Sequence, residues 1–231
     1  MNNLILVRHG QSFWNKERRF TGWADIGLTE EGNLEAERSG QLIKELNIKF
    51  HAYFTSQLKR AINSLEIILK ILGKQNVEII KSEALNERHY GGLTSLNKDE
   101  TIKKYGHKQV QVWRRSFNIP PPPMNSRHPY KGKISSHILG ESLKDTFERV
   151  MPYYNKKIEP LISSKKNILI VFHGNSCRSL LKKIFNISNE KIVEFEIPTG
   201  NPLLIRLEDN LKVKDYKYLD PNRAKKILFN T

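Results

Sequence analysis

The sequence predicts an α/β protein with a mostly parallel central sheet and helices on both faces. Short apolar runs alternate along the chain with segments of helical periodicity, which is the pattern of strands linked by crossover helices. The runs at residues 3–7 and 168–172 are apolar throughout, as expected for strands that are buried on both faces. A chain of 231 residues that is 38% hydrophobic can bury the core of one domain.

The first half is expected to hold a strand, a helix, a strand, a helix and a strand, at residues 3–7, 29–46, 52–55, 57–72 and 77–80. The first helix has Thr29 as a plausible N-cap. Its apolar residues Leu34, Leu42 and Leu46 recur at helical spacing. The second helix is followed by Gly73, which suits the left-handed conformation at a helix end.

The second half is expected to hold a long amphipathic helix, a strand, a helix and two strands, at residues 142–162, 168–172, 175–185, 203–207 and 213–218. Between the halves, the segment 119–123, Ile119 followed by four prolines, excludes helix and predicts an extended surface segment. That segment is either a domain linker or an excursion near the site. We favour the excursion, because the sheet needs strands from both halves. The chain is thus expected to form a single domain, 1–231, with 117–140 as a loop excursion and 220–231 as a tail.

The formal net charge of +15 admits a nucleic acid, an acidic membrane surface or a small polyanion as partner. The lysines are spread along the chain in pairs at most, which favours ordinary solvated faces over a nucleic-acid-binding stripe. No apolar stretch approaches the roughly 18 residues of a membrane span, and the first apolar run lacks the flanks of a signal peptide. Cys177 is the single cysteine. We therefore expect a cytoplasmic protein without disulfides or membrane contact.

Two expected strands end in the same way. Residues 3–7 lead into Arg8, His9 and a glycine, and residues 168–172 lead into His173 and a glycine. Ligand sites of α/β sheets lie beyond the carboxyl ends of the strands, so adjacent strands would bring both histidines to one ligand. A metal site is the competing interpretation. The sequence has no HExxH motif and no aspartate cluster near either strand end, so this interpretation is the weaker one.

Arginines next to these histidines favour phosphoryl chemistry. Arg8 adjoins His9, and Arg60 lies near the start of a helix that follows another strand. Guanidinium groups bind phosphate oxygens, and their charge discourages protonation of a nearby imidazole. Glu87 is a candidate acid/base, whose pKa a neighbouring phosphate should raise. The residues therefore predict a metal-free phosphoryl pocket, but they leave open which histidine attacks.

Several motifs resemble one known family. The segments RHGQSFWN, FTGWADIGLTEEG, TSQLKRA, ERHYGGL, LNKDET, WRRSF, GESLKD, HGNSCR and EIPTGNPL are similar to those of the cofactor-dependent phosphoglycerate mutases of the histidine phosphatase superfamily. The resemblance extends from Leu4 to Leu207. The FTGWAD and HYGGL segments, with Lys98, Arg114 and Arg115, narrow it to the mutases.

The resemblance implies a phosphoglycerate mutase-like fold and a role for each site residue. His9 would be the phosphorylated nucleophile, Arg8, Arg60 and His173 would hold the travelling phosphoryl group, and Glu87 would be the acid/base. The implied substrate-binding residues are Ser12, Asn15, Thr21, Gly22, Tyr90, Lys98, Arg114, Arg115, Gly174 and Asn175. The implied reaction interconverts 3-phosphoglycerate and 2-phosphoglycerate, primed by 2,3-bisphosphoglycerate and without a metal. The implied assembly is a homodimer or larger homo-oligomer.

Two features depart from the family pattern. The segment after the proline run is shorter than in many members, which brings a phosphatase into consideration, because lid closure excludes water from reactive intermediates. Cys177 occupies a position where leucine is usual, and we interpret it as a small buried thiol. A nucleic-acid-binding protein that kept an enzyme fold is the third hypothesis, and it rests on the net charge alone.

Overall fold

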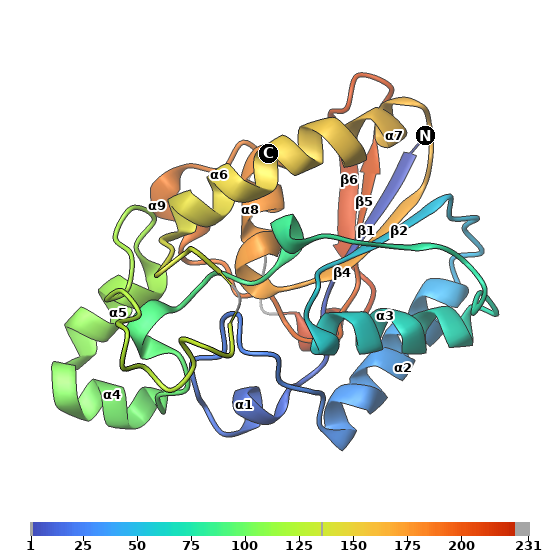
Figure 1. The fold of residues 1–231 in the computed structure, drawn as a ribbon. Helices are drawn as coiled ribbons and strands as arrows, with labels where there is room; N and C mark the ends of the chain where they lie inside the picture. Colours follow the sequence, from blue (N-terminus) through green and yellow to red (C-terminus); the bar gives the residue numbers. More distant parts are fainter. Residues whose placement is uncertain (1, 135, 225–231) are drawn as a thin grey trace.

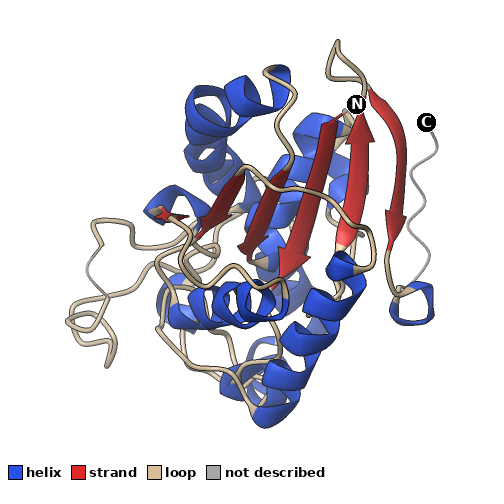
Figure 2. Cartoon of the chain, turned by 90° about the vertical axis from the view of Figure 1, so that its right-hand side faces the viewer, coloured by secondary structure: helices blue, strands red, loops and turns tan. Residues whose placement is uncertain are grey.

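A computed structural model describes residues 2–134 and 136–224. In this part of the chain a six-stranded sheet runs in the order β3-β2-β4-β1-β5-β6 (Figures 1 and 2). The strands are β1 (Asn2–Arg8), β2 (Ala52–Thr55), β3 (Ile79–Lys81), β4 (Ile168–Phe172), β5 (Leu203–Leu207) and β6 (Val213–Tyr218). The first four are mutually parallel, whereas β5 pairs antiparallel with β1 and β6 pairs antiparallel with β5. The expected α/β class with a mostly parallel sheet is confirmed.

Helices cover both faces of the sheet (Figure 2). Along β4, Leu169 and Val171 pack toward α2 and α3, whereas Ile168, Ile170 and Phe172 pack toward α6 and α8. The sheet therefore separates two hydrophobic cores. The helices are α1 (Phe13–Lys16), α2 (Glu30–Lys44), α3 (Lys59–Ile71), α4 (Lys98–Tyr105), α5 (His107–Arg115), α6 (Leu143–Tyr153), α7 (Glu159–Ser163), α8 (Gly174–Ile184) and α9 (Asn189–Ile192).

The expected apolar face of α2 is only partly correct, because Leu42 and Leu46 are half-buried and Leu34 is not. Thr29 caps the helix as predicted, because its hydroxyl accepts the Gly32 N–H at 3.1 Å. Leu34, however, is 52% exposed. The buried face consists of Gly32, Glu35, Ala36, Ser39, Gly40 and Ile43. Because most of these residues are small, α2 can lie close to α3 and to the neighbouring backbone. The buried face of α2 is therefore distinguished by small side chains and not by hydrophobic ones.

The single helix expected at residues 142–162 is three segments in sequence. A π-helical turn, Tyr154–Ile158, separates α6 from α7, and α6 contains Pro152. Pro160 follows at the start of α7. Proline has no N–H to donate to a helical carbonyl, and a wider turn is one way in which a helix accommodates that loss.

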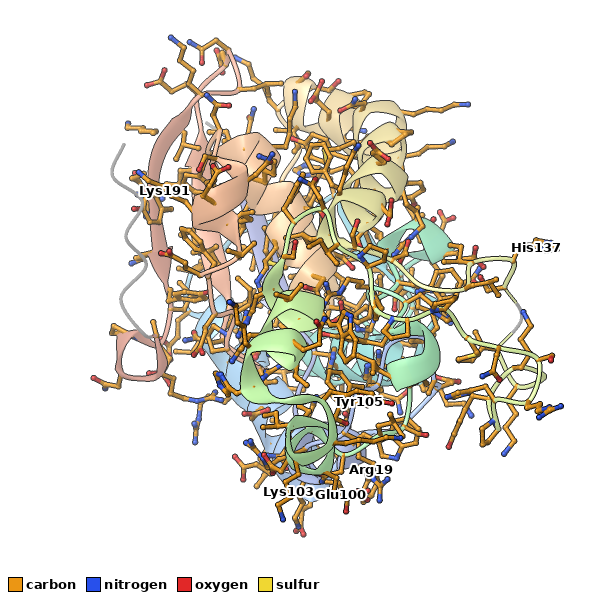
Figure 3. All side chains as sticks on the ribbon, turned by 90° about the vertical axis from the view of Figure 1, so that its left-hand side faces the viewer. Arg19, Glu100, Lys103, Tyr105, His137 and Lys191 are labelled. Carbon is orange, nitrogen blue, oxygen red and sulfur yellow. The ribbon has the colours of Figure 1, made fainter. Side chains whose placement is uncertain are left out.

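The excursion at 117–140 forms no helix or strand in its described residues, 117–134 and 136–140. Gly92 N–H donates to Pro122 O at 2.7 Å, which ties the first part of the loop to the body, and Met124 N–H donates to Leu139 O at 2.7 Å, which joins the two sides of the loop. Between these points the loop projects from the body, with exposed His137 on the projecting part (Figure 3). Because β1 to β3 and β4 to β6 come from opposite sides of this loop and share one sheet, we propose a single domain with an excursion.

The expected tail begins at Asp220, and its residues 225–231 lie outside the described residues. The described part stays close to the sheet, where Arg223 donates to Thr199 O at 3.0 Å and to Gly200 O at 3.2 Å. Within residues 2–134 and 136–224, every helix is too short or too polar to cross a membrane.

Candidate active site

The two glycine-flanked histidines meet at the carboxyl ends of adjacent strands. The register pairs Arg8 with Phe172, so His9 and His173 leave the sheet side by side. Their ring centroids are 5.0 Å apart, with the ring planes at 62°. Both side chains are almost completely buried, at 2% and 0% exposure. The structure therefore brings the two rings together, as the matching strand ends predicted.

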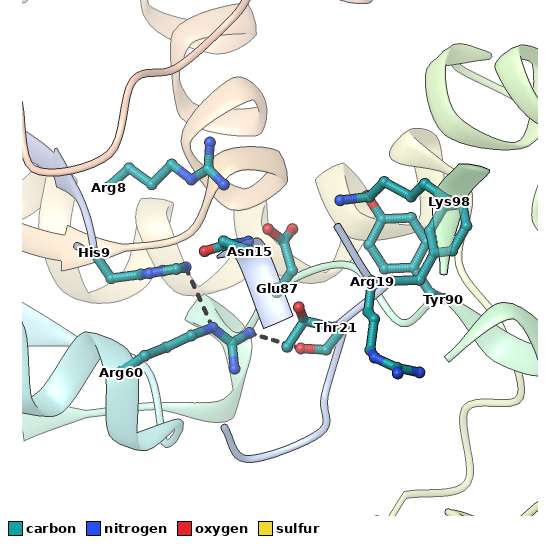
Figure 4. A pocket seen from close by; sticks show the side chains of 11 residues that line it. Arg8, His9, Asn15, Arg19, Thr21, Arg60, Glu87, Tyr90 and Lys98 are labelled. Carbon is teal, nitrogen blue, oxygen red and sulfur yellow. Dashed lines mark hydrogen bonds between the residues drawn. The ribbon is translucent and has the colours of Figure 1, made fainter. Parts of the chain in front are cut away.

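Hydrogen bonds to both ring nitrogens of His9 fix its tautomer. Its Nδ1 lies 2.6 Å from Gly10 O, a carbonyl that can only accept, so Nδ1 carries the proton. Arg60 Nε donates to His9 Nε2 at 3.2 Å, which places the lone pair on that nitrogen (Figure 4). Burial lowers the pKa of His9 well below its usual range, and Arg60 and Arg8 lower it further. Both effects favour the neutral imidazole, with burial as the larger cause.

The imidazole of His173 forms a hydrogen bond with a residue that the sequence analysis missed. Ser56 Oγ lies 2.7 Å from His173 Nε2, whereas His173 Nδ1 is buried without a hydrogen-bonding partner among the described residues. Burial and Arg60 lower the pKa of His173 well below its usual range. Ser56 directly follows β2 and lies in the TSQLKRA segment, from which only Arg60 was assigned to the site.

Glu87 lies at the N-terminus of α8. Its Oε1 accepts hydrogen bonds from Arg88 N at 2.8 Å, Asn175 N at 3.1 Å and Asn175 Nδ2 at 2.8 Å. Burial raises the pKa of Glu87, but these bonds and the charges of Arg8 and Arg60 outweigh burial, so the net pKa is lowered. The expected rise was attributed to a neighbouring phosphate, so it concerns the occupied site and stays a prediction.

Arg149 on α6 fixes the loop that carries Glu87. Its guanidinium donates to the backbone carbonyls of Ala84, Asn86 and Glu87, at 2.9, 3.3 and 3.2 Å. It also forms a bidentate pair with Glu141, at 2.7 and 2.9 Å, in which both side chains are largely buried. The sequence analysis missed this pair, because its members are separated from residue 87 by more than 50 positions.

A small cavity of about 60 Å³ lies in front of His9 (Figure 4). Glu87 and four cations face it from different elements, which agrees with the predicted phosphoryl pocket. The lining residues are Arg8, His9, Asn15, Arg19, Phe20, Thr21, Gly22, Arg60, Glu87, Tyr90 and Lys98. Arg19 and Phe20 were missed by the sequence analysis. They follow α1, directly before the predicted Thr21.

A larger cavity of about 390 Å³ shares Arg8, Asn15 and Lys98 with the small one. Arg114 and Arg115 from α5 line it, together with the missed Arg178, Arg223 and Thr199. The predicted Ser12, Gly174 and Asn175 line neither cavity. The Ser12 hydroxyl instead caps α1 by accepting Asn15 N–H at 3.3 Å, Asn175 holds Glu87, and a Cβ at Gly174 would lie 3.7 Å from Arg8 Nε.

Cys177 is 1% exposed, and burial raises the pKa of its thiol to about 12. The interpretation as a buried thiol is therefore confirmed. No group of three or more metal-ligating side chains occurs among residues 2–134 and 136–224.

The buried neutral histidines should make folding stability depend on pH. Burial also lowers the pKa of His89, to about 4. Since the unfolded chain binds these protons first, stability is complete above about pH 6.5 and falls as the pH drops toward the folded pKa values, by up to about 1.4 kcal/mol per pH unit for each histidine. Urea unfolding at pH 7.5, 6.5 and 5.5 measures the slope. His173→Asn should flatten it, whereas His107→Asn, at an exposed position, should not; equal slopes for wild type and His173→Asn would contradict the expectation.

Comparisons with known proteins agree with this geometry. The profile of the histidine phosphatase superfamily (branch 1) matches residues 4–215. The chain is 48% identical over 230 residues to a protein of Hyphomonas neptunium named 2,3-bisphosphoglycerate-dependent phosphoglycerate mutase, covering 97% of each chain. It is 47% identical to a protein of the same name from Caulobacter sp. strain K31, covering 96% of each chain.

Solved structures show the same fold at lower identity. A mycobacterial glucosyl-3-phosphoglycerate phosphatase superposes with a TM-score of 0.72 at 17% identity, covering 94% of this chain and 97% of that one. Bacillus stearothermophilus YhfR superposes with a TM-score of 0.72 at 22% identity, covering 92% of this chain and 94% of that one. From the sequence similarity and its superfamily profile, the chain belongs to the histidine phosphatase superfamily, and within it to the family of the 2,3-bisphosphoglycerate-dependent phosphoglycerate mutases.

Proposed function

We propose that this protein interconverts 3-phosphoglycerate and 2-phosphoglycerate through a phosphohistidine on His9. The observation that carries the proposal is the buried, neutral imidazole of His9, whose unprotonated Nε2 lies beside Arg60 at the edge of a cationic cavity. A neutral imidazole nitrogen is a nucleophile, and surrounding cations stabilise the charge on the oxygens of a transferring phosphoryl group. The names of relatives at 47–48% identity support the same activity.

The donor set suits a phosphorylated acid such as 2,3-bisphosphoglycerate. Arg8 Nε, Thr21 Oγ1 and His173 Nδ1 are buried and have no hydrogen-bonding partner among the described residues. Such groups are costly to leave unpaired, and phosphate oxygens can accept from them. Lys98, Arg114 and Arg115 would bind the second phosphate and the carboxylate in the larger cavity. When bound, the bisphosphate supplies the phosphoryl group that charges His9.

In the proposed cycle, His9 first accepts a phosphoryl group and then donates it. As acceptor, its Nε2 forms the N–P bond while the P–O bond breaks, and the proton that the departing oxygen needs comes from Glu87. As donor, phosphorylated His9 loses the group to the free hydroxyl of a monophosphoglycerate, and the hydroxyl proton passes to Glu87. His173 and Arg60 flank His9 and hold the phosphoryl oxygens in both directions. No metal is needed for these steps, since arginines supply the positive charge.

The remaining assignments follow from the family. We propose that Asn15, Thr21, Gly22 and Tyr90 complete the substrate site, since they line the cavity in front of His9. We also propose a cytoplasmic homodimer or larger homo-oligomer. The anionic substrate gives part of the high positive charge a role without a nucleic-acid partner.

A coupled assay on 3-phosphoglycerate, run with and without the bisphosphate primer, tests the proposal. The mutase should require the primer, and label from the primer should appear on the protein. Release of inorganic phosphate is measured in the same samples. If phosphate release exceeds isomerisation, the protein is a phosphatase on this scaffold and the proposal is wrong.

A further inference from the structure

Glu35 on α2 is a buried carboxylate that the proposed reaction does not use. It is 6% exposed and lines neither cavity, yet three donors from three segments converge on it. Its Oε2 accepts Gln11 N–H at 2.7 Å. Its Oε1 accepts from Thr199 Oγ1 at 2.8 Å and from Arg223 Nη2 at 2.5 Å.

The bond to Gln11 leads directly to the nucleophile. Gly10 C=O and Gln11 N–H belong to one planar peptide group, and they point in opposite directions because the bond is trans. The N–H side of this group bonds Glu35, and the C=O side lies 2.6 Å from His9 Nδ1. A single peptide group therefore connects a carboxylate to the ring nitrogen that carries the proton.

The local backbone fixes this peptide group against α2. A Cβ at Gly10 would lie 2.1 Å from Gly32 O, and a Cβ at Gly32 would lie 2.1 Å from Gln11 O, so both positions require glycine. Gln11 O in turn accepts Thr29 N–H at 2.9 Å. The close approach brings Glu35, one turn after Gly32, within reach of the Gln11 amide.

We propose that Glu35 is a positioning residue for His9, acting through the Gly10–Gln11 peptide group. A negative charge on the N–H side orients and polarises the peptide, which strengthens Gly10 C=O as an acceptor. The stronger acceptor keeps the proton on Nδ1 and leaves the lone pair on Nε2. A carboxylate bonded directly to a catalytic histidine holds its tautomer in the same way in serine proteases.

The charge that develops during phosphoryl transfer gives this arrangement a second use. When His9 Nε2 forms the N–P bond, the electrons of the broken P–O bond leave with the oxygen, and the ring keeps its Nδ1 proton and becomes cationic. Arg8 and Arg60 disfavour a cationic ring, as they disfavour protonated His9. On the Nδ1 side, the Gly10 carbonyl backed by Glu35 offers negative charge instead. The proposal rests on His9 being the nucleophile, and it extends the proposed function to a residue outside both cavities.

Nitrogen-15 NMR of histidine-labelled full-length protein tests the proposal without substrate. In the wild type, His9 should show a protonated Nδ1 and an unprotonated Nε2, with its signals assigned by their loss in His9→Gln. Glu35→Gln, which keeps the shape and removes the charge, should increase the Nε2–H tautomer. It should also slow single-turnover phosphorylation of His9 by about 10- to 100-fold, the usual effect of losing an outer hydrogen-bonding partner of a histidine, with little change in KM.

Two variants separate positioning from mere stability. Arg223→Met breaks the ion pair with Glu35 but leaves the bond to Gln11, so it should lower the unfolding temperature without moving the tautomer signals. Glu31→Gln makes the same change at an exposed position of α2 and should behave as wild type. If Glu35→Gln does not fold, Glu35→Asp withdraws the carboxylate while keeping its charge and should shift the tautomer in the same direction.

An unchanged tautomer and phosphorylation rate in Glu35→Gln would overturn the proposal, as would an equal tautomer shift in Arg223→Met. Failure of the proposed function looks different. In that case the wild type would not take up label from the primer, whereas the tautomer comparison would still report on Glu35.

Discussion

Replacing His9 with alanine is expected to reduce mutase turnover by at least about 10⁴-fold, because it removes the atom that forms the bond to phosphorus. The fold should survive, since the ring contacts a cavity on one side and its Nδ1 bonds only Gly10 O. A coupled assay with saturating primer measures the turnover. Label transfer from the primer to the protein should disappear in parallel.

His107→Ala is the matched control for this variant, because it removes an exposed histidine of α5 and should leave both readouts unchanged. His173→Ala distinguishes the two buried rings. It should slow the reaction but still permit labelling, since His9 keeps its free nitrogen. A His9→Ala protein that still takes up label, or a His173→Ala protein in which labelling alone is abolished, would assign the nucleophile to the other ring.

Replacing Glu87 with glutamine is expected to lower kcat by about 10²- to 10⁴-fold, the usual range for a general acid or base. Glutamine keeps an oxygen for the bonds from Arg88 N and Asn175 N, so the loop should stay in place. It cannot exchange a proton with the substrate hydroxyl. Initial rates with 3-phosphoglycerate, together with thermal unfolding, separate a chemical loss from a structural one.

The pH profile adds a second readout for Glu87. Its pKa is lowered in the free protein, which favours the carboxylate that accepts the hydroxyl proton of 3-phosphoglycerate, so kcat/KM for this substrate should fall in acid. Glu87→Gln should lose this acidic limb. Glu83→Gln, an exposed change four residues earlier, should retain both rate and limb. A wild-type rate or an intact acidic limb in Glu87→Gln would show that another group moves the proton.

The strands and the two histidines could be predicted because their signals are local. A buried strand appears in the sequence as a short apolar run, and ligand sites of α/β sheets lie where such runs end. The ends of β1 and β4 therefore identified His9 and His173 from the sequence alone. The face of α2 could not be predicted in this way, because small residues there are buried for their size and Leu34 is exposed.

Other features depend on contacts between segments far apart in the sequence. Arg149 holds the loop around Glu87 from a helix more than 60 residues away, and Arg223 reaches Glu35 across 188 positions. Neither pairing leaves a pattern in a single chain. The helices α4 and α5 were not predicted either, although three residues assigned from the resemblance, Lys98, Arg114 and Arg115, lie on them.

The two cavities that share Arg8, Asn15 and Lys98 differ in the size of molecule that each can hold. The small cavity in front of His9, about 60 Å³, is too small for a whole bisphosphorylated acid, whereas the larger cavity measures about 390 Å³. A mutase must present first one end and then the other end of the same three-carbon molecule to one nitrogen. The larger cavity, lined by Arg114, Arg115 and Arg178, can hold such a molecule next to the cavity in front of His9, so we expect the molecule to change ends there.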